Sequence, residues 1–496
     1  MNILLMSMPD ATPVVLHESA VHLPNLGIAS IGANLDPEHE VRIADLVRKR
    51  GRVKKSVEKL VARFRPDLIG LTAMTWQYDT SVKIAHLLKT LRPEAKVMLG
   101  GYHATLMFEE IAASPAAEWF DFLVRGEGEL AVRQLTRVLC GQGRFEDVAG
   151  LSWKENGVFR HNPRGENLDL AELKPPIRDK RRITSGYHII TKRGEVLETS
   201  RGCTRACNFC CMRHMYGRCF RAHPIERVLD DLDVIYYRRK TRWVFLSDDN
   251  FVLDVDRVMR LCDAIIARNY KGLVLSVQAD CLTISTHEDM VARMAEAGFR
   301  IVFLGIENGS KKNLAQAGKG NIVAASKKAI EVCHRNGMMV IAGLIFGFPD
   351  DDAQAIRENY EFFKEIGADI PYCQILTPYP KTGMRQKLIE AGLVENYDNY
   401  KRYNGMLANV RTRHLSAAEL QYQFWLQREQ VFGWWEPPEM LKKKGRLWTS
   451  VWTYVMKPIV KRRYEKTLRE KGWEGLYQEA EAYWQGMNHF PDLEGY

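Results

Sequence analysis

Residues 198–214 read ETSRGCTRACNFCCMRH and hold three closely spaced cysteines. Cys203, Cys207 and Cys210 follow the spacing C-x3-C-x2-C, and Cys211 directly follows the third. In a chain with ten cysteines among 496 residues, chance gives this spacing with a probability under roughly 1%. We therefore interpret the three cysteines as a metal-binding group.

The other cysteines narrow the choice of metal. They are scattered singly, whereas a structural zinc site uses four ligands, usually as two separated pairs. A cubane iron–sulfur cluster is normally held by four thiolates, so three thiolates leave one iron open to another ligand. An open iron indicates chemistry rather than electron storage, and a zinc knuckle or a coincidence is the alternative. Cys211 and Cys219 are better explained as ordinary small buried residues.

The length and composition indicate a multidomain globular protein. A chain of 496 residues has room for roughly two to four domains, and its 46% hydrophobic content suffices for packed cores. The longest apolar stretch, Gly337–Phe348, is too short to span a membrane and is typical of a buried strand. Because the N-terminal residues show no basic leader or cleavable apolar segment, we expect a cytoplasmic protein. In that reducing compartment clustered cysteines more often hold metal than form disulfides.

The positive charge is concentrated in one segment. The formal net charge is +10, and residues 441–470 hold ten Lys and Arg against two Glu, a net +8. Trp448, Trp452 and Val455 fall on one helical face between the basic clusters. We expect either a helix packed on the protein or an amphipathic helix in peripheral contact with a membrane. Nucleic acid is the least favoured partner, because no nucleic-acid module accompanies the charge.

The first part of the chain predicts a doubly wound parallel sheet over residues 1–145. Apolar β-like runs alternate there with helical stretches near 51–64 and 79–91, and such sheets bind ligands at the carboxyl edge of their strands. Gly100, Gly101 and His103 fall on one such edge, and Gly126 and Glu127 on another. The β-like runs are residues 2–9, 26–35, 39–46, 67–74, 96–101 and 120–129.

The same alternation of strand-like and helical stretches restarts after a connector at 146–190. Six βα units within 191–390 predict a partial or closed β/α barrel, whose chemistry is expected at the carboxyl ends of the strands. Polar residues collect at those ends, namely the cysteine loop, then Asp248 and Asp249, then Gln278, then Glu307. Residues 391–496 are predicted to form a mainly helical, aromatic and basic region. The strand-like runs are residues 196–202, 243–250, 273–280, 300–308, 338–349 and 369–380.

The cysteine spacing at the end of the first barrel strand closely resembles that of the radical S-adenosylmethionine (radical SAM) enzymes. In that family the open iron of a [4Fe–4S] cluster binds SAM, which is cleaved to a 5′-deoxyadenosyl radical. The resemblance implies that Cys203, Cys207 and Cys210 are the ligands. By the same resemblance, SAM contacts are expected at residues of the barrel strand ends: Phe209, Asp248, Gln278, Glu307 and Gly347.

The first domain resembles the cobalamin-binding domain of one radical SAM class. That class includes anaerobic magnesium-protoporphyrin ester cyclases and hopanoid-modifying enzymes. The stretches LPNLGIASIGANLDPEHEVRIADL, LGGYHATLMFEE and DFLVRGEGE carry the resemblance, although the cobalt-ligating signature D-x-H-x-x-G is absent. Because residues 1–150 contain only Cys140, a second cluster of the methylthiotransferase kind is not expected. The predicted cobalamin contacts are Thr72, Gly100, Gly101, His103, Gly126 and Glu127.

Each of these site residues also has a simpler explanation. Asp248 and Asp249 can cap the following helix, and Glu307 can be a barrel-mouth carboxylate held in a salt bridge. His103 can be a packed loop histidine, and the glycines of RGEGE can form a plain turn into the next helix.

The resemblance implies methylation of an unactivated carbon in a hydrophobic substrate such as a lipid, polycyclic compound or tetrapyrrole. Radical cyclisation or oxidation without methyl transfer is the alternative within the family. A non-catalytic cobalamin or cluster sensor is the alternative of another class, and an RNA-modifying enzyme using the basic segment is a third. A low-potential donor such as flavodoxin or ferredoxin is the expected electron source. Substrate identity lies beyond the sequence.

Overall fold

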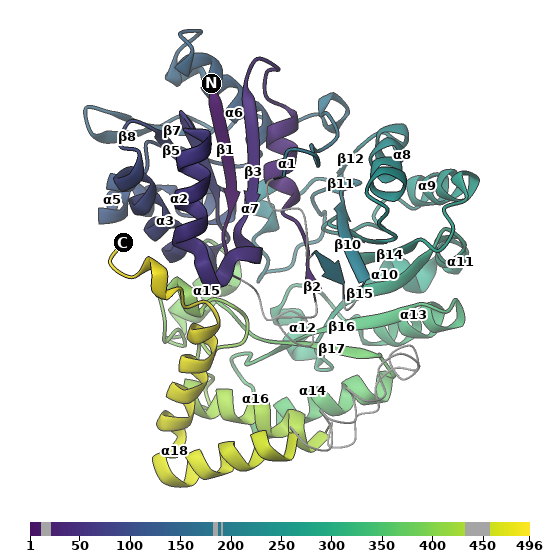
Figure 1. The fold of residues 1–496 in the computed structure, drawn as a ribbon. Helices are drawn as coiled ribbons and strands as arrows, with labels where there is room; N and C mark the ends of the chain where they lie inside the picture. The colour runs from purple at the N-terminus through teal and green to yellow at the C-terminus, as the bar shows by residue number, and fades with distance from the viewer. Residues whose placement is uncertain (11–20, 182–186, 190–191, 432–456) are drawn as a thin grey trace.

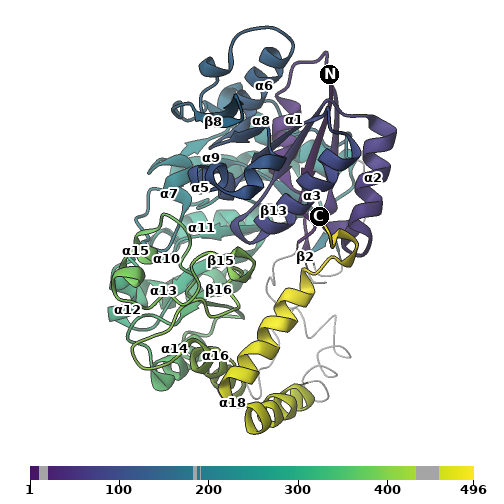
Figure 2. The same ribbon diagram turned by 90° about the vertical axis from the view of Figure 1, so that its left-hand side faces the viewer.

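The computed structural model describes residues 1–10, 21–181, 187–189, 192–431 and 457–496. It contains two large sheets, each accompanied by helices, that lie next to one another (Figure 1). A C-terminal helical segment extends from the helices of the second sheet towards those of the first (Figure 2). The predicted order of an α/β domain, a partial barrel and a helical region is confirmed.

The first sheet is doubly wound, with parallel strands in the order β3-β1-β4-β5-β6. Helices α1 and α6 pack on one face, and α2 and α3 pack on the other. Because both faces are covered, the strands are almost continuously apolar, as in Asn2–Ser7. The strands are β1 (Asn2–Ser7), β3 (Glu40–Asp45), β4 (Leu68–Thr72), β5 (Lys96–Gly100) and β6 (Phe122–Val124). The helices are α1 (Leu26–Ala33), α2 (Val53–Phe64), α3 (Tyr78–Leu91) and α6 (Gly128–Leu139).

One predicted strand of this domain is wrong, because residues 26–33 form helix α1. The side chain of Asn25 accepts a hydrogen bond from the backbone N–H of Ile28 and so starts the helix. The helix is apolar and half enclosed, with buried small residues such as Ala29 and Gly32. A short apolar run without periodicity cannot be told from a buried strand by its sequence pattern.

The stretch expected as a connector adds a hairpin to the first sheet. Strands β7 (Leu151–Glu155) and β8 (Val158–His161) pair antiparallel, and β7 pairs antiparallel with β6. Further along, the backbone of residues 180–181 bonds to Ile43 in the first sheet. Residues 146–181 are therefore packed structure rather than a loose link.

The second sheet contains six parallel strands that form the predicted partial (β/α)6 barrel. Their order is β17-β16-β15-β14-β13-β10, and the short strands β9 (His188–Ile189) and β2 (Val21–His22) extend it antiparallel beyond β10. β2 belongs by sequence to the first domain, so it ties the two sheets together. The parallel strands are β10 (Lys192–Leu197), β13 (Trp243–Leu246), β14 (Val274–Ala279), β15 (Phe299–Glu307), β16 (Met339–Phe346) and β17 (Ile370–Ile375).

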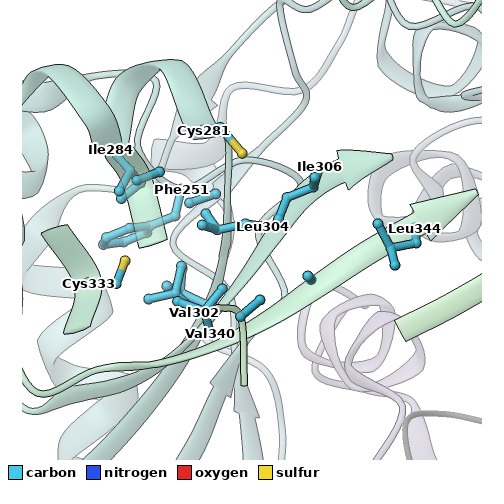
Figure 3. Packing of buried hydrophobic residues seen from close by; sticks show 14 of the residues in the cluster. Phe251, Cys281, Ile284, Val302, Leu304, Ile306, Cys333, Val340 and Leu344 are labelled. Atoms are coloured by element: carbon cyan, nitrogen blue, oxygen red, sulfur yellow. The ribbon is translucent and has the colours of Figure 1, made fainter. Parts of the chain in front are cut away.

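Side chains alternate along the barrel strands between the helices outside and the lumen inside. Val302, Leu304 and Ile306 of β15 face outwards and pack with Cys281 and Cys333 from the covering helices (Figure 3). These two cysteines are small apolar core residues. The covering helices include α8 (Ile225–Asp233), α9 (Val255–Arg268), α10 (Cys281–Thr286), α11 (Glu288–Glu296), α13 (Val323–Arg335) and α14 (Ala353–Ile366).

The C-terminal region contacts both domains. Helix α16 (Ala417–Val431) packs on α14, and α18 (Lys457–Met487), which is interrupted at Gly472, packs on α16. Phe490 and Leu493, beyond α18, are buried in the core of the first domain. The preceding residues 391–416 are less helical than predicted, with one 3₁₀ turn at Tyr400–Arg402 and a bridge between residues 394 and 410.

The predicted amphipathic face of Trp448, Trp452 and Val455 lies outside the described residues. Within the part of the chain that the structure describes, no helix is both long and apolar enough to cross a membrane.

Candidate functional site

The carboxyl ends of the two sheets face one another across two neighbouring cavities. The first, of about 450 Å³, is lined on one side by the loops after β4, β5 and β6, and on the other by residues near the cysteine loop. We call it the glycine-edge cavity. The second, of about 540 Å³, lies between the end of β1 and the inward side chains of β13 to β17, and we call it the lumen cavity. Leu23, Pro24, Asn25 and Gln77 border both.

The cysteine loop lies between β11 (Ser200–Arg201) and α7 (Met212–Tyr216). It is fixed through Asn208, whose backbone N–H donates to Ala317 O (2.8 Å) and whose side-chain amide donates to Gln316 O (3.0 Å). The carbonyl of Asn208 accepts from Met384 N (3.0 Å). Gly318, with φ +74°, lets the two segments approach, because a Cβ there would lie 2.8 Å from Ala206 O. The loop is therefore held on one side by residues 316–318 and on the other by the start of α15 (Gly383–Glu390).

The three thiols of the loop interact electrostatically, Cys207 with Cys203 and Cys210 with Cys207, and their environment suits a bound cation. All three cysteines are half-buried free thiols. Burial raises the pKa of Cys207, and burial raises the pKa of Cys210 to about 12, with smaller contributions from neighbouring thiols. A buried thiol becomes a thiolate most readily when a metal supplies the compensating charge. The thiol triad thus fits an iron–sulfur cluster.

Two of the expected SAM contacts lie where a cofactor could meet them, Glu307 near Cys207 and Gln278 on the wall of the lumen cavity. Glu307, at the end of β15, has a left-handed backbone (φ +64°) and an ion pair with Lys319 Nζ at 2.6 Å. Lys319 also donates to Gly305 O at 2.9 Å, and a Cβ at residue 305 would lie 2.5 Å from Nζ and would displace the lysine head group. Gln278 lines the lumen cavity and donates to the carbonyl of Asp248. The salt-bridge explanation and a cofactor contact are thus compatible for Glu307.

The other expected SAM contacts lie away from the two cavities. Phe209 packs against the barrel core, and Gly347 donates its N–H to Asp351 Oδ2 at 2.9 Å. Asp248 is fully buried and accepts hydrogen bonds from the backbone N–H of Thr199 and the hydroxyl of Ser200. It braces the chain just before the cysteine loop.

The cap expected from Asp248 or Asp249 is wrong, because Asp254 caps α9 through Arg257 N. Asp249 instead accepts from Gly202 N at 2.8 Å and lines the glycine-edge cavity with Tyr216. Burial raises the pKa of Asp249 to about 7.

Five of the six expected cobalamin contacts line the glycine-edge cavity: Thr72, Gly100, Gly101, Gly126 and Glu127. Gly101 has φ +91°, and a Cβ on it would lie 2.8 Å from both Ala73 O and Thr72 Oγ1. Gly126 has φ +75° and donates its N–H to Thr105 Oγ1 at 2.9 Å. A bare backbone edge of this kind suits close approach of a large planar ligand, so the residues present fit cobalamin.

His103, the sixth, lies elsewhere. It is fully buried and packs between Tyr78 (ring centroids 4.2 Å) and Tyr400 (4.8 Å). Neither ring nitrogen has a hydrogen-bond partner among the described residues, and burial lowers the pKa of His103 to about 3. The packed-histidine explanation therefore matches its position.

An ion-pair network that the sequence reasoning missed joins the two domains beside the glycine-edge cavity. Arg201, two residues before Cys203, donates to Glu127 Oε1 (2.8 Å) and Glu129 Oε1 (2.6 Å) from the first domain and to Glu198 (3.0 Å) from the barrel. Glu127 also accepts from Arg221 at 2.9 Å. Burial opposes ionisation of Glu198, but Arg201 and His223 together outweigh it and lower the pKa of Glu198 to about 2.

The sequence contained a signal for this network. From Thr199 to Ile225 the chain has five arginines and no carboxylate. Buried members of such a run require acidic partners from elsewhere in the fold.

Comparison with protein families agrees with the two halves of the site. Residues 12–136 match a B12 binding domain, and residues 197–363 match the radical SAM superfamily. The first match covers the strands of the glycine edge, and the second covers the cysteine loop and the barrel strands through β16. The cofactors of the chain are accordingly cobalamin, a [4Fe–4S] cluster and SAM.

Individual relatives extend the similarity over most of the chain. An uncharacterized methyltransferase of Pyrococcus horikoshii is 27% identical over 418 residues, covering 84% of this chain and 89% of the relative. The anaerobic magnesium-protoporphyrin IX monomethyl ester cyclase of Rubrivivax gelatinosus is 24% identical over 398 residues, covering 75% and 70%.

A solved structure shares the whole architecture. The cobalamin-dependent S-adenosylmethionine radical enzyme OxsB, with aqua-cobalamin and S-adenosylmethionine bound, matches with a TM-score of 0.69 at 18% identity. The match covers 98% of this chain and 71% of that chain, and it establishes the fold. With the two family matches and three half-buried thiols on one loop, the chain is a cobalamin-binding radical SAM enzyme of the methyltransferase type.

Proposed function

We propose that the protein methylates an unactivated carbon of a hydrophobic substrate bound in the lumen cavity. The main support for this proposal is the position and lining of that cavity, which lies inside the barrel and borders the glycine-edge cavity. When bound, the cofactors of this family supply hydrogen abstraction and a methyl group. A substrate between the two sites is within reach of both.

The lining of the lumen cavity favours an apolar substrate. Phe303 lies across Gly343, where a Cβ would come 2.8 Å from its ring, and Phe303 packs edge-on against Tyr372 (5.4 Å). At about 540 Å³ the cavity has the volume of a typical small-molecule site. The apolar wall is formed by Phe245, Val277, Ile301, Phe303, Ile341 and Tyr372.

The polar groups of the lumen cavity gather at its first-domain end. Both carboxylate oxygens of Asp45 already accept a hydrogen bond, one from the hydroxyl of Ser7 and the other from Asn25 N. Asp10 accepts from Thr80 through one oxygen, and its other oxygen has no partner among the described residues. A substrate with an apolar body and one hydrogen-bond donor at its end would match this arrangement.

The residues of the chain act by holding, orienting and excluding water. Cys203, Cys207 and Cys210 would hold the cluster, and Glu307 with Lys319 offers a fixed pair of opposite charges for the zwitterionic end of SAM. The glycine edge would receive cobalamin through backbone contacts. Asp248 and Asn208 fix the loop that carries the thiols, so the distance between the two cofactor sites is set by folding.

The test uses protein purified without oxygen, with iron, sulfide and cobalamin quantified. Reductant, SAM and candidate hydrophobic substrates are then added, and 5′-deoxyadenosine and S-adenosylhomocysteine are assayed together. Both products with a methylated substrate would support the proposal. Deoxyadenosine with a changed but unmethylated substrate would favour the cyclisation or oxidation branch. Bound cofactors without either product would favour a sensor.

Two controls accompany the test. Cys203→Ala should lose both products, which ties them to the thiol triad. Polar analogues of each substrate should react poorly, and turnover of polar substrates alone would contradict the assignment of the lumen cavity.

A further inference from the structure

The segment that carries the cluster ligands is unusually basic. Residues 199–225 include five arginines and no Asp or Glu. Two of them, Arg201 and Arg221, are directed inwards to Glu127. The remaining three, Arg205, Arg213 and Arg218, are exposed. The interdomain network therefore explains only part of this charge.

Two of the exposed arginines have no internal role that the structure shows. Arg205 pairs with Asp280 at 2.9 Å. Arg213 and Arg218 have no carboxylate partner among the described residues, and Arg213 contacts only the ring of the adjacent His214. Lys381, which is also exposed, lies close to His214 and pairs with Glu110. The surface over α7 thus has an excess of positive charge.

This surface is also the outer side of the cysteine loop. Residues 204–206, between the first two cysteines, are exposed, while the cysteines themselves are half-buried. In Figure 2, α7 lies near the edge of the molecule, and α4 (Tyr102–Leu106) contacts it from the first domain. The inner side of the loop faces the barrel and the glycine-edge cavity. Residues 204–206 are therefore the exposed part of the loop between two of the proposed cluster ligands.

We propose that Arg213 and Arg218, with the exposed loop 204–206, form the docking surface for a small acidic one-electron carrier protein. This inference rests on the proposed function and names the partner of the same site. The carrier loses one electron and the cluster gains it, and no bond is formed or broken in the transfer. Exposed charges at the rim of an interface steer association and make it depend on ionic strength.

An acidic protein fits better than a nucleic acid. The basic surface is short and is centred on the cysteine loop, whereas nucleic-acid binding uses a stripe of basic residues that follows a backbone.

The experiment compares two double variants of the reconstituted holoenzyme. Arg213→Glu with Arg218→Glu reverses the charge at the proposed surface. Lys55→Glu with Lys59→Glu makes the same change of charge on the exposed face of α2. A reduced flavodoxin is the probe, and its dissociation constant and the rate of cluster reduction are measured at low and moderate salt.

We expect the Arg213/Arg218 variant to bind flavodoxin at least about tenfold more weakly at low salt and to reduce its cluster correspondingly slowly. The difference should shrink as salt is raised, because screening removes the steering. The Lys55/Lys59 variant should behave as the unmodified enzyme. Arg213→Lys with Arg218→Lys keeps the charge and should retain most of the affinity.

Reduction by dithionite keeps this inference separate from the proposed function. Unchanged dithionite-driven deoxyadenosine formation in the Arg213/Arg218 variant, together with weaker flavodoxin binding, would support the docking surface. Equal flavodoxin binding in both double variants, or a loss with dithionite as well, would overturn it. Weakened binding of single-stranded RNA with unchanged flavodoxin binding would also overturn it. Failure of the unmodified enzyme with dithionite would count against the proposed function instead.

Discussion

The two sheets end in edges of different character. The first-domain edge is built from glycines and main chain, with Gly101 and Gly126 in left-handed conformations. The barrel edge is built from side chains that are charged or reactive, such as the thiol triad and the Lys319–Glu307 pair. The glycine edge admits a large ligand by removing side chains, and the barrel edge holds a small charged group by supplying them.

This difference indicates which kind of mutation should impair each edge. Side-chain removal on the barrel edge takes away ligands or leaves buried charges unpaired. Side-chain addition on the glycine edge crowds the neighbouring loops of the same domain and so changes the shape of the edge that would receive the ligand. Each prediction below tests one side of this contrast.

The largest effect is expected at the thiol triad. Cys207→Ala should reduce bound iron and deoxyadenosine formation to background, because two thiolates do not hold the cubane cluster. Iron content and the absorption of the reconstituted protein measure it. Cys211→Ala is the matched control, since Cys211 packs against the core of the first domain and should leave the iron content unchanged.

Next in size is the interdomain network. Arg201→Gln leaves Glu127, Glu129 and Glu198 without their shared cation, and the side chain of Arg201 is only 7% exposed. Breaking a buried pair costs about 3–5 kcal/mol, which we expect as a loss in the free energy of unfolding measured in urea.

Arg205→Gln is the control for this variant, because its pair with Asp280 is 41% exposed on the arginine side. Its cost should stay below about 1 kcal/mol. Similar losses in the free energy of unfolding for the two variants would show that the buried network contributes no more stability than an exposed ion pair.

At the glycine edge, substitution should lower both cobalamin affinity and stability. Gly101→Ala places a Cβ 2.8 Å from Ala73 O at φ +91°, and we expect cobalamin affinity to fall by about tenfold or more, about 1.4 kcal/mol. Equilibrium binding of hydroxocobalamin to the purified apoprotein measures it. Gly157→Ala has similar backbone strain (φ +81°) with open space around it, so it should lose some stability but no cobalamin affinity.

The smallest effect concerns pH and Asp10. Burial raises the pKa of Asp10 from 3.8 to about 7, against the opposing hydrogen bond from Thr80. Between these values the folded chain binds more protons than the unfolded chain, so stability falls as pH rises from about 4 to 7. Asp10→Asn should remove up to about 1.4 kcal/mol per pH unit of that slope. Urea unfolding at several pH values measures it, and parallel slopes for the two proteins would contradict it.

The sequence predicted most of the fold because its strands carry strong local signals. Five of the six barrel strands lie where their apolar runs are, and so do the five parallel strands of the first domain, whereas β10 starts four residues before its predicted run at 196–202. Helix α1 was missed because an enclosed helix has no polar face to reveal its period. The β7–β8 hairpin was missed because its strands are short and most of their exposed positions are polar or charged.

For the site, the sequence predicted which residues lie there better than it predicted which neighbours those residues contact. The thiol triad is signalled by spacing alone, and the glycine edge by its place after parallel strands. The roles of Asp248 and His103 depend on neighbours such as Thr199 and Tyr400, which are far away along the chain. Lys319 and Arg201 belong to no recognisable sequence motif. The role of a buried cation becomes clear only when the carboxylates that it contacts are known.

The burial of Phe490 and Leu493 in the first domain has a consequence for biosynthesis. Their packing partners on α2 and α3 leave the ribosome first, whereas these two residues are made hundreds of positions later. At about 5–20 residues per second the delay is on the order of tens of seconds. The nascent first domain therefore exposes an apolar patch throughout synthesis of the barrel, and a chaperone that binds such patches would find its substrate there.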